Sequence, residues 1–120
     1  MKKKLFRSLI FVQQSQTNGY GVFAGQSFNK ENKIEECYMI LSHGGDKVLE
    51  DYYFDVNGKS AVFTGFGSIY NHSTKPNAYF TIDVRKRLAT LRALRRIHEG
   101  EEIFISYGRF WFNSRSLKPI

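Results

Sequence analysis

The sequence predicts a single, mainly β domain with one or two short helices, and three observations support this. Short runs rich in β-branched and aromatic residues follow one another at close spacing, with glycine or asparagine turns between them. Aromatic residues make up 16% of the 120 residues, so even this short chain can fill a hydrophobic core. No repeat, Pro/Ser-rich linker or low-complexity stretch divides the chain. We therefore expect one domain over residues 1–120.

The first half of the chain contains three β-type runs. Phe6–Gln13 is the first, and the polar stretch Gln14–Asn18 ends it. Tyr20–Ala24 is a second, shorter run, bounded by glycines. Ile34–Ser42 contains enough apolar residues for a pair of strands, and Gly44–Gly45 marks the turn that follows.

A hairpin is the strongest local signal in the second half. Asn57–Gly58 separates the aromatic pair Tyr53–Phe54 from the apolar run Ala61–Phe63, and Asn-Gly is the favoured dipeptide of two-residue hairpin turns. Two further strands are expected, each next to a loop or turn: Tyr79–Ile82 after the loop Pro76–Asn77, and Ile103–Ser106 after the turn Glu99–Gly100.

The segment Leu88–Ile97 is ambiguous on sequence pattern alone. Its Ala, Leu and Arg content favours a helix. Its apolar residues recur every third position, however, which does not make the stripe of an amphipathic helix, and arginines interrupt both faces. The pattern therefore leaves helix and strand open.

The chain is strongly basic, with a formal net charge of +7 and a pI near 9.6. Such a charge suggests nucleic acid, an acidic surface or another polyanion as a partner. We interpret most of the charged runs as solvated faces. The basic clusters are Lys2–Lys4 with Arg7, and Arg85–Arg87 with Arg92, Arg95 and Arg96; the acidic ones are Glu35–Glu36, Glu50–Asp51 with Asp55, and Glu99 with Glu101–Glu102.

Several classes of function are excluded by what the sequence lacks. The single Cys37 excludes an internal disulfide and a cysteine-cluster zinc site, and its apolar surroundings predict a buried structural thiol in a reducing compartment. The three histidines have no metal-ligand spacing, so no metal is expected. No apolar run approaches the roughly 20 residues of a membrane span, and Arg7–Ser8 interrupts the N-terminal run that superficially resembles a signal peptide.

Three strings together are more informative than any single residue. They are GYGVFA at Gly19–Ala24, GSIYNHSTKPNA at Gly67–Ala78 and EGEEIFISYG at Glu99–Gly108. Their order and spacing resemble the SET-domain protein lysine methyltransferases. LEDYYF at Leu49–Phe54 and the aromatic end Phe110–Phe112 extend the resemblance over nearly the whole chain. The chain looks closest to the very small SET proteins encoded by large DNA viruses.

The resemblance implies a particular mainly β fold. A SET domain has several small β-sheets with short helices, and its C-terminal segment passes beneath a surface loop as a pseudoknot. Such a pseudoknot would bring the Asn71 loop and the Tyr107 strand side by side. SET domains also place a strand where Leu88–Ile97 falls. We expect a single SET domain over residues 1–120, without flanking zinc-binding regions.

The resemblance also implies a reaction, the transfer of a methyl group from S-adenosylmethionine to a lysine Nε, with S-adenosylhomocysteine as the product and no metal. The lysine must be neutral to attack, although its free pKa is about 10.4, and an apolar channel disfavours the ammonium form. Tyr107 matches the catalytic tyrosine of the family and would direct its hydroxyl at the reacting centre. From the residues alone, a core tyrosine on a strand is the alternative.

Further site residues follow from matching positions. The cofactor would be held by Asn71 and His72, by the backbone of Tyr20 and Gly21, and by Trp111 stacked on the adenine, a place that Phe110 or Phe112 could take instead. Tyr52 would wall the lysine channel, with Tyr53 the weaker candidate, although both could simply be hairpin aromatics. Phe80 and Ile105 fall near the two places where such enzymes set the degree of methylation.

The expected partners combine the resemblance with the charge. The substrate would be a lysine-containing protein, most simply a histone tail, which a chain of +7 must bind through a local acidic groove such as Glu50, Asp51 and Asp55. The basic clusters could bind nucleosomal DNA. The missing zinc-binding flank makes a homodimer plausible, and no membrane partner is expected. The expected compartment is the nucleus, of the host if the protein is viral, with the cytoplasm as the alternative.

Two other functions remain open at this stage. One is a basic nucleic-acid-binding module, in which Arg85–Arg96 carries binding and Tyr107 is dispensable. The other is an inactive SET-like domain that binds cofactor or peptide without turnover. Cofactor binding separates them, because the module should show none and the inactive domain should bind without transferring a methyl group.

Overall fold

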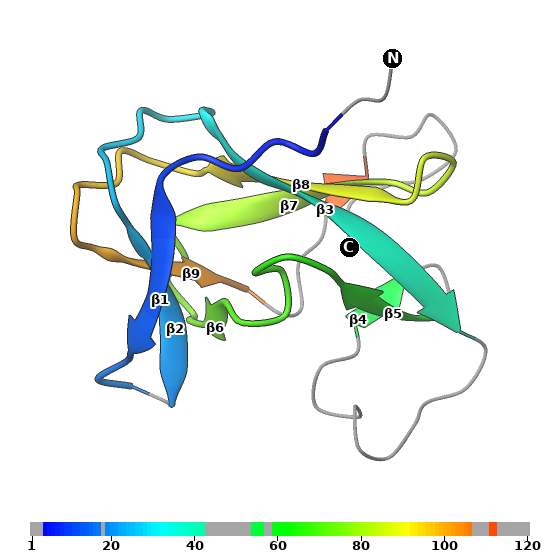
Figure 1. The fold of residues 1–120 in the computed structure, drawn as a ribbon, viewed down its shortest axis with the longest axis horizontal. Helices are drawn as coiled ribbons and strands as arrows, with labels where there is room; N and C mark the ends of the chain where they lie inside the picture. The colour runs from blue at the N-terminus through cyan, green and yellow to red at the C-terminus, as the bar shows by residue number, and fades with distance from the viewer. Residues whose placement is uncertain (1–3, 18, 43–53, 57–58, 107–110, 113–120) are drawn as a thin grey trace.

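Figure 1 shows the fold in a computed structural model, which describes residues 4–17, 19–42, 54–56, 59–106 and 111–112. Two curled β-sheets pack against each other, one of four strands and one of six. The described residues form strands and turns without a helix, so the mainly β class is confirmed, and the expected short helices do not occur in this part of the chain. The strands are β1 (Ile10–Gln14), β2 (Tyr20–Ala24), β3 (Lys33–Ser42), β4 (Phe54–Val56), β5 (Lys59–Phe63), β6 (Asn71–His72), β7 (Ala78–Asp83), β8 (Leu88–Ala93), β9 (Glu102–Ile105) and β10 (Trp111–Phe112).

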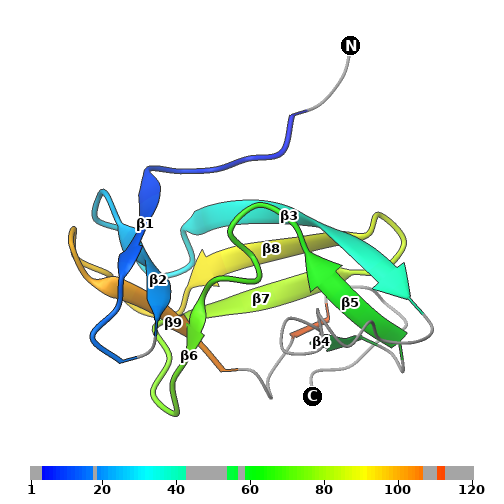
Figure 2. The same ribbon diagram turned by 60° about the horizontal axis from the view of Figure 1, so that its bottom comes forward.

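The smaller sheet has the strand order β1-β2-β9-β6. β2 pairs antiparallel with both β1 and β9, whereas the short β6 runs parallel to β9, with Asn71 opposite Phe104 and His72 opposite Ile105. Figure 2 shows these two strands, far apart in the sequence, side by side. The expected neighbourhood of the Asn71 loop and the strand that leads toward Tyr107 is therefore present. The pseudoknot itself depends on residues 107–110, which lie outside the described residues, and stays a prediction.

The larger sheet has the order β10-β7-β8-β3-β5-β4. Its β3 is one ten-residue strand, so the expectation of a strand pair in Ile34–Ser42 is wrong. The first part of β3 pairs with β8 and the part from Met39 to Ser42 pairs with β5. One strand with two successive partners needs as many apolar residues as two short strands, which explains the length of the run.

The ambiguous segment is a strand over Leu88–Ala93, as the family resemblance implied. β8 lies between β3 and β7 in the sheet, and Ala89, Thr90 and Leu91 are all buried in succession. A central strand covered on both faces needs no alternation of apolar and polar residues, so its sequence does not show the usual β pattern. The hairpin around positions 57–58 is also confirmed, because Val56 pairs with Lys59.

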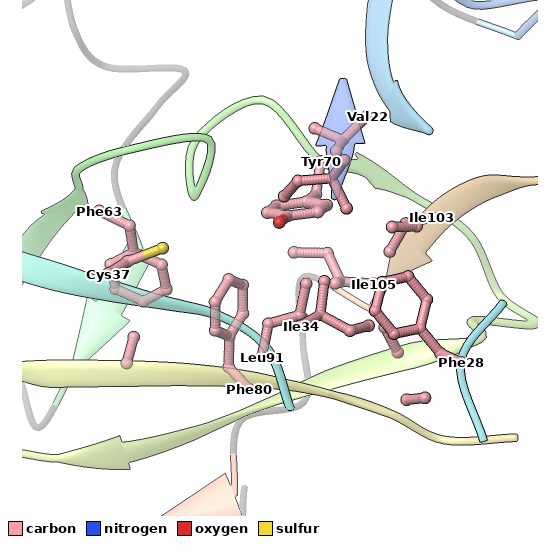
Figure 3. Packing of buried hydrophobic residues seen from close by; sticks show 14 of the residues in the cluster. Val22, Phe28, Ile34, Cys37, Phe63, Tyr70, Phe80, Leu91, Ile103 and Ile105 are labelled. Carbon is pink, nitrogen blue, oxygen red and sulfur yellow. The ribbon is translucent and has the colours of Figure 1, made fainter. Parts of the chain in front are cut away.

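The hydrophobic core fills the space between the two sheets (Figure 3). Aromatic rings from β5, β7 and the segment before β6 meet there, with Phe80 4.9 Å from Phe63 and 6.0 Å from Tyr70 between ring centroids. Cys37 is fully buried in this core, which confirms the structural thiol. Burial, and then the neighbouring Glu35 carboxylate, raises the pKa of the Cys37 thiol far above its ordinary value.

The acidic pair Glu35–Glu36 corrects the interpretation of the charged runs as solvated faces. Glu35 is fully buried and Glu36 is 6% exposed, because the N-terminal segment runs along the start of β3 and covers them. Glu36 accepts hydrogen bonds from Phe6 N at 2.9 Å and from Lys33 Nζ at 3.1 Å. This segment was expected to belong to the first strand, which instead begins at Ile10.

Glu101, in the turn between β8 and β9, is expected to make the stability of the folded protein depend on pH. Glu101 accepts hydrogen bonds from His98 N at 2.7 Å and Arg95 Nη2 at 3.2 Å. Partial burial alone would raise the pKa of Glu101, but these two donors outweigh it and lower the pKa. A carboxylate with a lowered pKa in the folded state stabilises the protein at neutral pH and loses that stabilisation as the pH falls through the folded pKa.

We therefore expect Glu101→Gln to be less stable than wild type near pH 7 and to approach it as the pH falls through the lowered pKa of Glu101. Urea unfolding at several pH values measures this. The exposed Glu99 is the control, since Glu99→Gln should leave the pH profile unchanged, and equal profiles for wild type and Glu101→Gln would contradict the prediction.

Two further findings concern the described part of the chain. It contains no helix with the length and apolar character needed to cross a membrane. It also contains no group of three or more histidine, cysteine or carboxylate side chains arranged to hold a metal ion.

Candidate active site

Asn71 is the centre of a polar cluster that joins three strands of the smaller sheet. Its Nδ2 donates to the carbonyl oxygen of Tyr20 on β2 at 3.2 Å and to Glu102 Oε2 on β9 at 2.8 Å. The other carboxylate oxygen of Glu102 accepts from Ser15 Oγ at 2.7 Å. Because Asn71 is only 7% exposed, these partners replace the water that its amide would otherwise bind. The cluster fixes β6 against β2 and β9.

Gly21 is required by this cluster. A Cβ atom on Gly21 would overlap the Glu102 carboxylate and lie 2.9 Å from Asn71 Nδ2. The sequence expectation was that the glycine allows a cofactor to approach the backbone closely. In the structure the space beside Gly21 is occupied by the protein's own side chains, which gives the glycine a packing reason of its own. Its part in cofactor binding stays a prediction.

Asn77 anchors the other end of the loop that follows β6. Its side chain donates from Nδ2 to Glu102 O at 2.9 Å and accepts at Oδ1 from Phe104 N at 2.7 Å, and it is 1% exposed. At the start of the loop, Ser73 N donates to Ile105 O at 2.9 Å. Both ends of the loop are therefore held on β9. Asn77 was part of the matched string, but sequence reasoning gave it no role beyond a loop position.

A small cleft of about 230 Å³ opens beside this loop, lined by His72, Thr74, Pro76 and Ser106. His72 is exposed, and Ser106 is the residue before Tyr107 in the chain. Tyr20, on β2, exposes 66% of its surface. Three of the four lining side chains can form hydrogen bonds, which suits the polar groups of a nucleoside or amino-acid ligand.

Tyr70 directly precedes Asn71 in the chain, and its hydroxyl binds the buried Glu35. The Tyr70 hydroxyl donates to Glu35 Oε1 at 2.6 Å, while Glu35 Oε2 accepts from Phe66 N at 2.9 Å and from Arg7 Nε at 3.2 Å. Burial, and then the Glu35 carboxylate, raises the pKa of Tyr70 well above its ordinary value, so the hydroxyl remains a donor. Sequence reasoning missed this support, although a glutamate inside an apolar strand was a signal for it.

The two residues expected to set the degree of methylation lie in the core. Phe80 and Ile105 are each 1% exposed, and the Phe80 ring packs against Phe63 and Tyr70. Phe80 and Ile105 are therefore core side chains, and their contact with a substrate stays a prediction.

The remaining expected site residues cannot be placed. Tyr52, Tyr53, Tyr107 and Phe110 lie outside the described residues, as do Glu50 and Asp51. For β10, with Trp111 and Phe112, the structure gives only the backbone, which pairs parallel with β7 opposite Thr81 and Ile82. The roles expected for all these site residues, like those of Tyr20, Gly21, Asn71 and His72, remain predictions.

Comparisons with known proteins agree on one family. The SET domain family model matches residues 19–108. A histone-lysine N-methyltransferase, H3 lysine-37 specific, from Schizosaccharomyces pombe (strain 972 / ATCC 24843) is 31% identical over 97% of this chain and 85% of its own length.

Solved structures show the same fold. A proposed histone methyltransferase of Plasmodium falciparum has a TM-score of 0.72 and 31% identity, covering 86% of this chain and all of its own. A chain of ctPRC2, solved in complex with trimethylated and lysine-to-methionine forms of histone H3, has a TM-score of 0.70 at 24% identity. That match covers 86% of this chain and 15% of the ctPRC2 chain, and it shows the fold alone.

The polar cluster around Asn71, the parallel pair β6–β9 and these matches together define the class of protein: this chain belongs to the SET-domain family. The expected likeness to viral SET proteins stays a prediction.

Proposed function

We propose that this protein transfers methyl groups from S-adenosylmethionine to the Nε of lysine in a protein substrate, and that the substrate is histone H3. Membership of the SET family and 31% identity to an H3-specific lysine methyltransferase support the reaction class. The observation that carries the proposal is the clamp by which Asn71 holds β6 beside β9, since β9 leads directly toward Tyr107. This clamp brings together the strings Gly67–Ala78 and Glu99–Gly108, which resemble the SET family most specifically.

The described residues fit a polar cofactor. Asn71 and His72 lie on the edge strand β6, which pairs with β9 and is also held by the Asn71 side chain. A cleft with hydroxyl and imidazole groups lies beside them, and Tyr20 is exposed on β2 of the same sheet. S-adenosylmethionine, when bound, supplies an electrophilic methyl group on a sulfonium. Asn71, His72 and the backbone of Tyr20 and Gly21 would bind it, with Trp111 against the adenine. A preformed site of this kind holds the reacting groups in line without reorganisation.

Tyr107 would orient the lysine amine. The free amine has a pKa of about 10.4, so most of it is protonated and unreactive at neutral pH. An apolar channel walled by Tyr52 or Tyr53 would favour the neutral form by desolvation, and solvent would accept the proton. The hydroxyl of Tyr107 would then direct the amine lone pair along the transfer axis.

The location and assembly of the protein are also proposed. With a histone as its substrate, the protein would act in the nucleus. We also propose a homodimer, in which a second copy of the chain would complete the lysine channel.

The experiment is a methyl-transfer assay with labelled S-adenosylmethionine, core histones and a mixed cell extract, comparing wild type with Tyr107→Phe. We expect label on a lysine of histone H3 with the wild type and none with Tyr107→Phe, and mass spectrometry identifies the site. The same two proteins are tested for cofactor binding by calorimetry, because Tyr107→Phe should still bind it.

Each alternative predicts a different result. Cofactor binding without transfer to any protein would indicate an inactive SET-like domain. Neither binding nor transfer would contradict the proposal and favour the basic nucleic-acid-binding module instead.

A further inference from the structure

The second basic cluster of the sequence divides into two groups at opposite ends of β8. At the end of β8 and just after it, three arginines are engaged with other parts of the protein: Arg92 donates to Glu31 O at 3.1 Å, Arg95 to Glu101 Oε2 at 3.2 Å, and Arg96 to Asn29 Oδ1. Before β8, Arg85, Lys86 and Arg87 are all exposed, and within the described residues none of their side chains forms an ion pair. We call these three residues the basic turn.

The basic turn has a fixed backbone. Lys86 N donates to Asp83 Oδ1 at 3.2 Å, Arg87 N to Val84 O at 3.2 Å, and Met39 N on β3 to Arg87 O at 2.8 Å. Asp83, the nearest carboxylate in the sequence, thus binds a backbone amide of the turn. Three cations are therefore held close together on a fixed backbone, which itself loses little conformational entropy when the side chains bind.

Arg87 adds an independent observation. Its φ is +54°, in the left-handed region where a side chain is unfavourable and glycine is preferred. A basic side chain thus stands where the backbone favours glycine. Backbone strain of this kind at an exposed position is a reason to look for a function of the side chain.

We propose that the basic turn is a docking surface for the phosphate backbone of double-stranded DNA. Consecutive exposed cations that form no ion pair within the described part of the chain provide what phosphate binding requires. The +7 net charge attracts the same partner over a longer range. The choice of DNA rests on the proposed function, since histone substrates are wrapped in duplex DNA. The contact is with phosphates and therefore independent of base sequence.

The basic turn lies away from the Asn71 cluster. It forms the far end of the β7–β8 hairpin, whereas β6 and β9 lie near the other end of that hairpin in both views (Figures 1 and 2). β10, in contrast, pairs with β7 at Thr81 and Ile82, directly before Asp83, the last residue of β7. DNA held by the turn would therefore lie beside the C-terminal strand and leave the cleft at His72 and Ser106 open.

The test measures binding of the full chain to a fluorescent 20-base-pair DNA duplex by anisotropy between 50 and 200 mM KCl. Each phosphate contact contributes about 0.9 to the slope of log K against log salt, so Arg85→Gln/Lys86→Gln should reduce the slope by about 2 and weaken binding at 50 mM by about a hundredfold. The control is Lys4→Gln/Lys30→Gln, which removes the same charge from two other exposed positions and should change the slope by much less.

A second variant separates folding from binding. We expect Arg87→Gly to retain or raise the thermal midpoint, because glycine relieves the positive φ, and yet to bind DNA more weakly. Unchanged DNA affinity in Arg87→Gly and in Arg85→Gln/Lys86→Gln would overturn the proposal. Equal losses in the basic-turn double variant and the control double variant would also overturn it, because net charge alone would then explain binding. Tighter binding to an RNA duplex of the same length would contradict the assignment to DNA.

This test does not depend on methyl transfer. If the protein binds DNA through the basic turn but transfers no methyl group, the proposed function fails and the docking surface stands. If both are right, Arg85→Gln/Lys86→Gln should methylate a free H3 peptide at the wild-type rate and a nucleosome more slowly.

Discussion

Replacing Glu35 with alanine is expected to destabilise the protein by about 3 kcal/mol or more, because this buried carboxylate accepts from the Tyr70 hydroxyl in the core and from a partly buried backbone amide. Glu35 is fully buried and accepts from the Tyr70 hydroxyl and from Phe66 N. Each donor left unsatisfied in the core costs about 1–3 kcal/mol. Arg7, the third partner, is about half exposed on its side chain and can return to water, so it adds less.

Urea unfolding at pH 7 measures this effect, and a double-mutant cycle assigns it. Tyr70→Phe removes the hydroxyl alone and should cost less than Glu35→Ala. The double variant should be more stable than the sum of the two single effects predicts, since the hydroxyl that loses its Glu35 acceptor in Glu35→Ala is then absent. Glu99→Ala, at an exposed position, is the control and should lie within about 0.5 kcal/mol of wild type. A loss below 1 kcal/mol in Glu35→Ala would show that water reaches the site.

The strand positions were largely predictable because they depend on local chemistry. The bounds of Tyr20–Ala24 were predicted correctly, since glycine on each side ends a short β-branched and aromatic run. The Asn-Gly hairpin followed from the preference of that dipeptide for a tight turn. β8 was not predictable from periodicity, because both of its faces are buried and one of its two neighbours in the sheet, β3, comes from a distant part of the chain.

The candidate site was predictable in part, for a similar reason. The resemblance pointed to Asn71 and Gly21, and the structure brings both together with Glu102. Glu102 itself was assigned to a solvated acidic run, and Glu35 to another. A glutamate inside an apolar strand, such as Glu35, signals burial, but no local pattern shows that the distant N-terminal segment will cover it. Buried polar networks formed by long-range contacts are therefore the part that sequence reasoning missed.

Gly21→Ala is expected to reduce methyl transfer by about a hundredfold, because it disturbs the side chains that hold Asn71. The added methyl group would overlap the Glu102 carboxylate, which cannot move freely because Ser15 and Asn71 both donate to it. Displacing Glu102 frees Asn71 and shifts β6 against β9. A misplacement of about 1 Å in a group that positions the reactants costs roughly 10²-fold in rate. The assay is the rate of label transfer to histone H3, with cofactor affinity measured by calorimetry.

Two further variants separate positioning from stability. Glu102→Gln keeps the shape of the side chain, and its amide can accept from Asn71 with the oxygen while donating to Ser15 with the nitrogen, so we expect near-wild-type cofactor affinity. Gly19→Ala introduces a methyl group into open space at a φ of +50°, so it should lower stability by about 1 kcal/mol without weakening cofactor binding. Overpacking at Gly21 should cost about 1–3 kcal/mol as well. If Gly21→Ala and Gly19→Ala lose the same stability and neither loses affinity, Asn71 does not depend on the space beside Gly21 for its position.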